Sequence, residues 1–228
     1  MTETSLYLGI KILEPTTAAT DLLLSFFCVY FYYKLKLPTK SEPLLKFWRL
    51  FFLIFGITTF IGTMAHGLKF YMSEKLFWNV WMAMNLSSVL SSYFLLLATI
   101  EMVRKDNTVL LKKLKVLARI VTLTITIVTI VLNDFSMIKI YAGVVVILAL
   151  YRNFTTFRQG IKGSGQIAFG FAFSILSILV HTTGFSLHEY FNFKDLSHII
   201  ILISLCFIFM GAMNKTRIEP TEQEILHT

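Results

Sequence analysis

The chain has 228 residues, of which 56% are hydrophobic, 15% aromatic and only 15% charged, with a mean hydropathy of +0.70. A soluble domain carries roughly 25% charged residues, and it could not bury 22 Phe beside so much Leu, Ile and Val without exposing large apolar patches. These figures exclude an ordinary water-soluble globule, a disordered tail and a disulfide-stapled secreted module. They predict a protein whose solvent is the lipid bilayer.

Seven apolar stretches are long enough to cross the hydrocarbon core as helices, which takes about 20 residues each. They span residues 14–36, 46–70, 77–102, 114–133, 136–157, 165–188 and 195–213, with turn formers and charges between them. The runs are too long, and alternate too little, for an outer-membrane barrel. We therefore expect an all-α membrane protein, a single bundle of seven transmembrane helices within residues 1–213, followed by a polar tail over 214–228.

The basic residues predict the orientation of this bundle. With seven spans, sixteen of the 21 Lys and Arg residues fall on the side that receives the C-terminus, and five fall on the other side. The positive-inside rule then places the N-terminus outside and the C-terminus in the cytoplasm. The net charge of +8 is thereby explained by basic residues that mark the cytoplasmic side. The expected partners are membrane lipids, with no nucleic acid among them.

Four of the five His residues and three acidic residues inside the predicted spans fall in the outer half of the membrane. Because a charge within lipid is costly, such residues are candidates for a functional site. They are Glu14, Asp21, His66, His181, His188, Asp195 and His198, with Asn79 and Asn85 at the start of the third span. Glu14 and Asp21 are seven residues apart and share a helix face, as do His181 and His188, while Asp195 and His198 are three apart.

Imidazoles and carboxylates that meet in an apolar setting are typical ligands of zinc, which lowers the pKa of bound water to near neutrality. A hydrolytic site inside the membrane is one interpretation. The structural alternatives are a helix-capping role for Glu14 before Pro15, a contact between helices for Asp21 or His66, and an interfacial position for His188.

Three segments resemble the CREST superfamily of seven-helix membrane proteins, which includes alkaline ceramidases and the progestin and adiponectin receptors. The segment from Phe191 to Ile200, running on to Gly211, resembles the last helix of that superfamily, and Gly62 to Gly67 resembles its second-helix motif. Glu14 to Asp21 resembles the first helix of small, mostly bacterial members of uncharacterised function. The resemblance implies a zinc-dependent hydrolase of a lipid amide or ester in a bacterial cytoplasmic membrane.

Carried over residue by residue, the resemblance makes His66 and His198 zinc ligands. The first seventh-helix His falls at Lys194, the motif Ser falls at Gly62, and the third helix offers Asn79 or Asn85 in place of an acid. Two hypotheses follow. In one, Asp195, His188 or His181 completes the zinc shell, and Asp21 or Asn79 assists the bound water. In the other, the chain is a non-catalytic lipid-binding or signalling protein that has lost the complete metal site.

Overall fold

The computed structural model describes residues 4–7, 9–35, 43–102, 108–132, 135–188 and 190–216. Its architecture is all-α, as predicted. The helices are α1 (Pro15–Lys34), α2 (Pro43–Gly67), α3 (Glu74–Glu101), α4 (Thr108–Leu132), α5 (Phe135–Arg158), α6 (Ser164–Thr183) and α7 (Phe193–Thr216), with a short 3-10 helix η1 at Lys69–Tyr71. Strands β1 (Thr4–Tyr7) and β2 (Ile10–Leu13) form an antiparallel hairpin ahead of α1.

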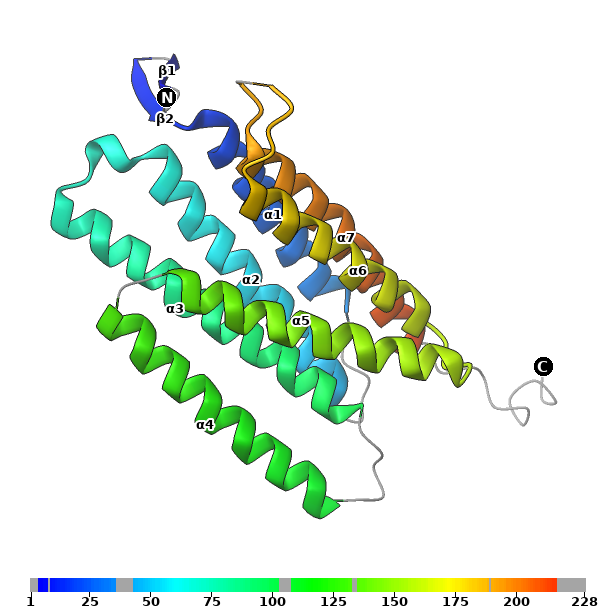
Figure 1. Ribbon diagram of the computed structural model, residues 1–228. Helices are drawn as coiled ribbons and strands as arrows, with labels where there is room; N and C mark the ends of the chain where they lie inside the picture. The colour runs from blue at the N-terminus through cyan, green and yellow to red at the C-terminus, as the bar shows by residue number, and fades with distance from the viewer. Residues whose placement is uncertain are drawn as a thin grey trace.

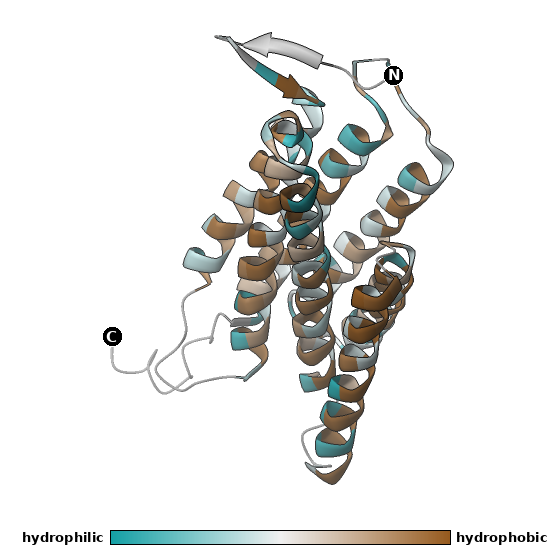
Figure 2. Cartoon of the chain, turned by 90° about the vertical axis from the view of Figure 1, so that its left-hand side faces the viewer, coloured by the Kyte–Doolittle hydropathy of each residue, from teal (hydrophilic) through white to brown (hydrophobic). Residues whose placement is uncertain are grey.

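Six of these helices, α2 to α7, are long and apolar enough to cross a membrane. The chain is therefore built as a multi-pass membrane protein, and Figure 2 shows hydrophobic residues along most of the length of its helices. Helix α1 differs because its first two turns carry Thr16, Thr17, Thr20 and Asp21, which lower its hydropathy. Most of these polar side chains are buried inside the bundle, so that α1 is covered by protein where it is polar.

Six helices close into a ring, and the seventh lies outside it. Each helix of the ring packs against the next in the order α1, α2, α3, α5, α6, α7, and α7 packs against α1. Helix α4 packs mainly on α3 and α5, and it lies at the edge of the bundle in Figure 1. Only Ala118, Thr122 and Thr129 of α4 are buried, so that most of its apolar surface faces outward. The ring brings the first, second and last helices together.

The two ends of the bundle carry different connections. One end, called here the hairpin end, holds β1–β2, the start of α1, the α2–α3 turn and the α6–α7 loop; the other holds the end of α7 (Figure 1). The hairpin rests on η1, because the Lys11 backbone N–H donates to Tyr71 Oη at 2.8 Å. This hairpin was not predicted from the sequence.

Small residues fix α6 against α7. They recur every seven residues on both antiparallel helices and meet as the pairs Gly163–Gly211, Gly170–Ser204 and Ser177–Ser197. Ser204 Oγ donates to Gly170 O at 2.7 Å, and Ser177 Oγ donates to Ser197 O at 3.0 Å. A Cβ at Gly211 would stand 2.5 Å from Gly163 O. Such close backbone approach is how helices associate in lipid, where burial of apolar surface gives no drive. These three pairs are called the α6–α7 seam.

Two expected boundaries are wrong or lie outside the described residues. The helix expected over 165–188 ends at Thr183, because Gly184 adopts a left-handed conformation (φ 69°) and its N–H caps Val180 O. The predicted shared face of His181 and His188 therefore does not exist. Within the polar tail expected over 214–228, α7 continues to Thr216, and residues 217–228 lie outside the described part of the chain.

Candidate functional site at the hairpin end

Glu14 joins three helices through one carboxylate. It is the residue before Pro15 and holds a left-handed backbone conformation (φ 52°, ψ 58°), which is strained for a residue with a side chain. Its Oε2 lies 2.6 Å from His66 Nδ1 at the end of α2. Lys194 Nζ, in the first turn of α7, donates to Oε1 at 2.8 Å and to Oε2 at 3.0 Å. Glu14, His66 and Lys194 are called the charged triad.

The charged triad is partly screened from solvent. The side chains of Glu14, His66 and Lys194 are 15%, 17% and 28% exposed. The hydrogen bond from His66 and the bonds and charge of Lys194 outweigh the opposing effect of burial, and they lower the pKa of Glu14 from 4.5 to about 2. Glu14 is therefore a carboxylate at neutral pH. Its two oxygens are bonded to Lys194 and His66.

Asp195 helps to cap the N-terminus of α7. Asn192 is the N-cap residue: its Oδ1 accepts from Lys194 N at 2.8 Å, while Asp195 Oδ2 accepts from Asn192 N at 2.9 Å. This reciprocal arrangement is a capping box with Asn and Asp in place of the more frequent Ser and Glu. The other oxygen, Oδ1, accepts from Thr17 Oγ1 of α1 at 2.7 Å. Asp195 is fully buried, and both its oxygens serve the helix start and the α1–α7 contact.

Asp21 and His198 face each other one turn deeper. Asp21 Oδ1 lies 3.6 Å from His198 Nε2, and Thr20 Oγ1 lies 3.0 Å from His198 Nδ1. Asp21 is only 4% exposed. Its carboxyl occupies the space that a side chain at Gly62 would need, because a Cβ there would stand 2.7 Å from Asp21 Oδ2. Glycine at position 62 therefore makes room for the carboxyl that α1 supplies.

The side chains of Glu14, Thr17, Thr20, Asp21, His66, Lys194, Asp195 and His198 are called the hairpin-end cluster. The other predicted site residues have different surroundings. His188 is exposed in the α6–α7 loop, where its ring stacks on Tyr190 and its Nδ1 accepts from Tyr190 N at 3.2 Å. Asn79 is exposed near the start of α3. Asn85, the other candidate on α3, is fully buried, and neither its amide nitrogen nor its oxygen has a hydrogen-bond partner among the described residues. His181 packs its ring edge-on against Phe193.

Among the described residues, the four expected to bind zinc, His66, Asp195, His188 and His198, do not come together as one group. His66 Nδ1 is bonded to Glu14, both Asp195 oxygens are taken by Thr17 and Asn192, and His188 is exposed in a loop. Lys194, an ammonium, stands in the resemblance at the place of a ligand and is paired with Glu14. Within the described residues, no group of three or more His, Cys, Asp and Glu side chains is close enough together to hold a metal ion.

Sequence reasoning missed three members of the cluster. Thr17 and Thr20 had no role in the expected site, and Lys194 counted only as a misfit in the zinc motif. The spacing could have found Thr17, because Glu14, Thr17 and Asp21 follow the i, i+3, i+7 pattern of one helix face in an otherwise apolar helix. The partner of Glu14 is 180 residues away, which no local pattern indicates.

The fold and the hairpin-end cluster define a helical membrane protein with a polar site inside an apolar bundle. Comparison with known families places it further: residues 16–217 match a family of unknown function (DUF6962), and the chain belongs to that family. No curated protein and no solved structure matches the chain. The matched segment includes Thr17, Asp21, His66, Lys194 and His198, so that the cluster lies within the family's extent except for Glu14.

Proposed function

We propose that all seven helices span the membrane, with the hairpin end outside and the C-terminus in the cytoplasm of a bacterial cell. The support is the distribution of Lys and Arg between the two sides of the predicted spans. Cysteines introduced at Lys75, on the hairpin side, and at Arg158, on the other, test this in intact cells. A membrane-impermeant maleimide should label the Lys75→Cys variant only; labelling of the Arg158→Cys variant alone would reverse the orientation.

We propose further that the protein binds a membrane lipid at the hairpin end and does so without a metal ion. The observation that carries this proposal is the bond of Lys194 Nζ to both oxygens of Glu14, at the position where the CREST resemblance expects a zinc-binding His. An ammonium beside His66 repels a divalent cation, and it offers a partner to an acceptor group of a lipid head. We also propose that the chain is related to the CREST superfamily.

The charged triad supports a mode of binding as well as a site. Lys194 is the most exposed of the three side chains, so that a phosphate, carboxylate or carbonyl oxygen of a lipid reaches it first and competes with Glu14. Because Lys194 and Asp195 form the first turn of α7, a change in the partner of Lys194 acts directly on the position of that helix. This links ligand binding to α7 and fits a signalling role.

Photocrosslinking tests lipid binding at this site. The full chain is reconstituted in vesicles that contain a photoreactive, clickable fatty acid or ceramide, and the labelled peptides are mapped. We expect labelling at the starts of α1 and α7, reduced about tenfold in Lys194→Met, because a charge-assisted bond is lost. Lys75→Met, at the same end of the bundle, is the matched control. Equal labelling of the Lys194→Met variant and wild type would refute the proposal.

A second candidate is hydrolysis of a lipid amide or ester, as the resemblance implies. The observation that favours it is His198 held between Thr20 and Asp21, an imidazole with a hydroxyl on one nitrogen and a carboxyl facing the other. Fatty-acid release from ceramides and lysolipids, with His198→Ala as control, distinguishes the candidates. Elemental analysis of wild type, His66→Ala and His198→Ala accompanies it; turnover or stoichiometric metal that both variants lose would favour the hydrolase.

A further inference from the structure

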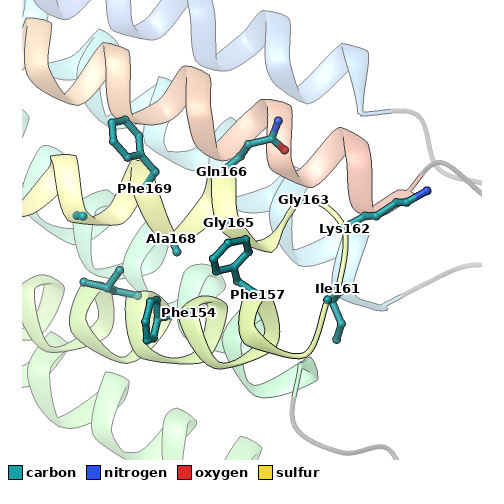
Figure 3. A pocket seen from close by; sticks show the side chains of 12 residues that line it. Phe154, Phe157, Ile161, Lys162, Gly163, Gly165, Gln166, Ala168 and Phe169 are labelled. Carbon is teal, nitrogen blue, oxygen red and sulfur yellow. The ribbon is translucent and has the colours of Figure 1, made fainter.

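An open apolar groove lies far from the charged triad, at the end of the bundle opposite the hairpin. It has a volume of about 660 Å³ and lies between the end of α5 and the first half of α6. Phe154 and Phe157 of α5 and Phe169 of α6 form its walls, and Gly165 and Ala168 line it between them (Figure 3). The three Phe side chains are about half exposed, so the groove opens sideways, toward the lipid.

The groove is shaped by the absence of side chains along α6. Ala168 is buried, and a Cβ at Gly165 would stand 2.8 Å from the ring of Phe157. Small residues therefore let the aromatic side chains of α5 lie across α6 and leave the groove open beside them. Between Gly165 and Ala172 the channel follows two turns of α6, about 10 Å at 1.5 Å per residue. A channel of this composition, open to the bilayer interior, suits a hydrocarbon chain.

Lys162 gives the groove a charged end. It lies in the α5–α6 turn and lines the groove, and its side chain extends beyond the ends of the helices in Figure 3. Apolar walls within the membrane and an ammonium just past them match the two parts of a phospholipid. Arg158 and Lys215 are at the same end of the bundle, on the side that the positive-inside rule assigns to the cytoplasm. The cytoplasmic leaflet carries the anionic lipids.

We propose that this groove binds an anionic phospholipid of the leaflet in which α6 begins. One acyl chain lies between the α5 aromatics and Ala168, and the phosphate or anionic head lies beside Lys162. The site is independent of the charged triad, which is at the other end of the bundle and in the other leaflet. Either site can therefore fail its test without affecting the other.

Native mass spectrometry of the full chain tests the proposal. The protein is released from detergent micelles that contain phosphatidylglycerol and phosphatidylcholine with identical acyl chains, and the retained lipid is counted. We expect phosphatidylglycerol to be retained in preference. Lys162→Gln should reduce that preference about fivefold, the contribution of one basic residue near an anionic surface. Lys139→Gln, an exposed lysine toward the opposite end of α5, is the matched control and should change nothing.

A second variant tests the groove itself. Ala172 lines the groove and is exposed, so that Ala172→Phe fills the channel without disturbing the buried core. It should reduce retention of both lipids, whereas Lys162→Gln affects only the anionic one. An unchanged lipid ratio in Lys162→Gln, or unchanged retention in Ala172→Phe, would overturn the proposal. So would a shift of Ala172→Phe from an oligomer to a monomer with lipid retention intact, because the groove would then be an interface between copies of the chain.

Discussion

Helix α7 is held in two different ways by its two neighbours. Against α6, the glycine and serine residues of the α6–α7 seam let the two helix backbones approach each other closely. Against α1, the contact depends on side chains: the charged triad and the Thr17–Asp195 bond at the hairpin end, and the stacked rings of Phe31 and Phe209 further along, with centroids 4.3 Å apart. Close approach of two backbones fixes one geometry, whereas ion pairs between side chains can exchange partners. The side of α7 that faces α1 is therefore the side on which the proposed lipid would act.

The largest expected effect comes from breaking the seam. Gly211→Leu would place a side chain 2.5 Å from both Gly163 O and Ile167 Cγ1, and we expect it to lower the free energy of unfolding by about 3 kcal/mol, since packed backbones cannot move aside. Reversible unfolding in mixed micelles measures this. Gly143→Ala on α5 is the control, because nothing lies within 4 Å of the added Cβ; there we expect a gain of about 0.5–1 kcal/mol from helix propensity. Similar losses in both variants would contradict the close-packing explanation.

Removing the cation of the charged triad should have the next largest effect. Lys194→Met leaves Glu14 half-buried with one of its two partners, and we expect a loss of about 2 kcal/mol in the free energy of unfolding. The double variant Glu14→Gln with Lys194→Met removes the uncompensated charge and should recover part of that loss. A double-mutant cycle measures the coupling between the two residues. Additive effects of the two substitutions would show that the pair contributes nothing.

A smaller effect is expected where Asp21 fills the space at Gly62. Gly62→Ala brings a methyl group to 2.7 Å from Asp21 Oδ2, and we expect it to cost about 1 kcal/mol as the carboxyl moves aside. Combined with Asp21→Ala, the same methyl group has room and should cost nothing further. Thermal unfolding of the single and double variants decides this; an equal cost in the presence and absence of Asp21 would place the strain elsewhere.

A separate prediction concerns the pH dependence of stability. The folded-state pKa of Glu14, about 2, lies below its ordinary value of 4.5, so the triad stabilises the fold fully above pH 4.5. That contribution is lost as the pH falls from 4.5 toward 2, because the carboxylate must then bind a proton. Unfolding measured across this window should show a steeper decline for wild type than for Glu14→Gln. Parallel curves would assign the acid sensitivity to other groups.

The sequence predicted the overall fold well and the site only in part. Long apolar runs fix the helices because an unpaired backbone is not tolerated in lipid. The end of α6 was placed too late, because Phe185 and Leu187 prolong the apolar run beyond Gly184, whose left-handed turn ends the helix. Asp21, His66 and His198 were identified as site residues because ionisable groups are rare in such helices. Which of them contact one another, and the contacts of Thr17, Thr20 and Lys194, could not be predicted, because pairing across helices depends on how the ring closes.

Asp195 illustrates the limit of motif reasoning. Its spacing from His198 suggested a shared ligand role, yet its carboxylate completes the capping box of α7. Both roles place an acid in the first turn of a helix, and the residue type alone does not separate them. Asn192, three residues earlier, is the signal that favours the cap. The seam was likewise present in the sequence as two sets of small residues seven apart, although only the antiparallel packing of α6 and α7 pairs them.

The charged triad also constrains how the protein is made. Glu14 leaves the ribosome 180 residues before Lys194, a delay of roughly 10 to 40 s at the usual speed of synthesis. During that time Asp21 has no His198 to face, and Glu14 has only His66 as a partner. The ring and its polar site are completed by the last helix to insert. A nascent chain that stops before α7 therefore leaves the carboxyl groups of Glu14 and Asp21 without Lys194 and His198, their partners on α7.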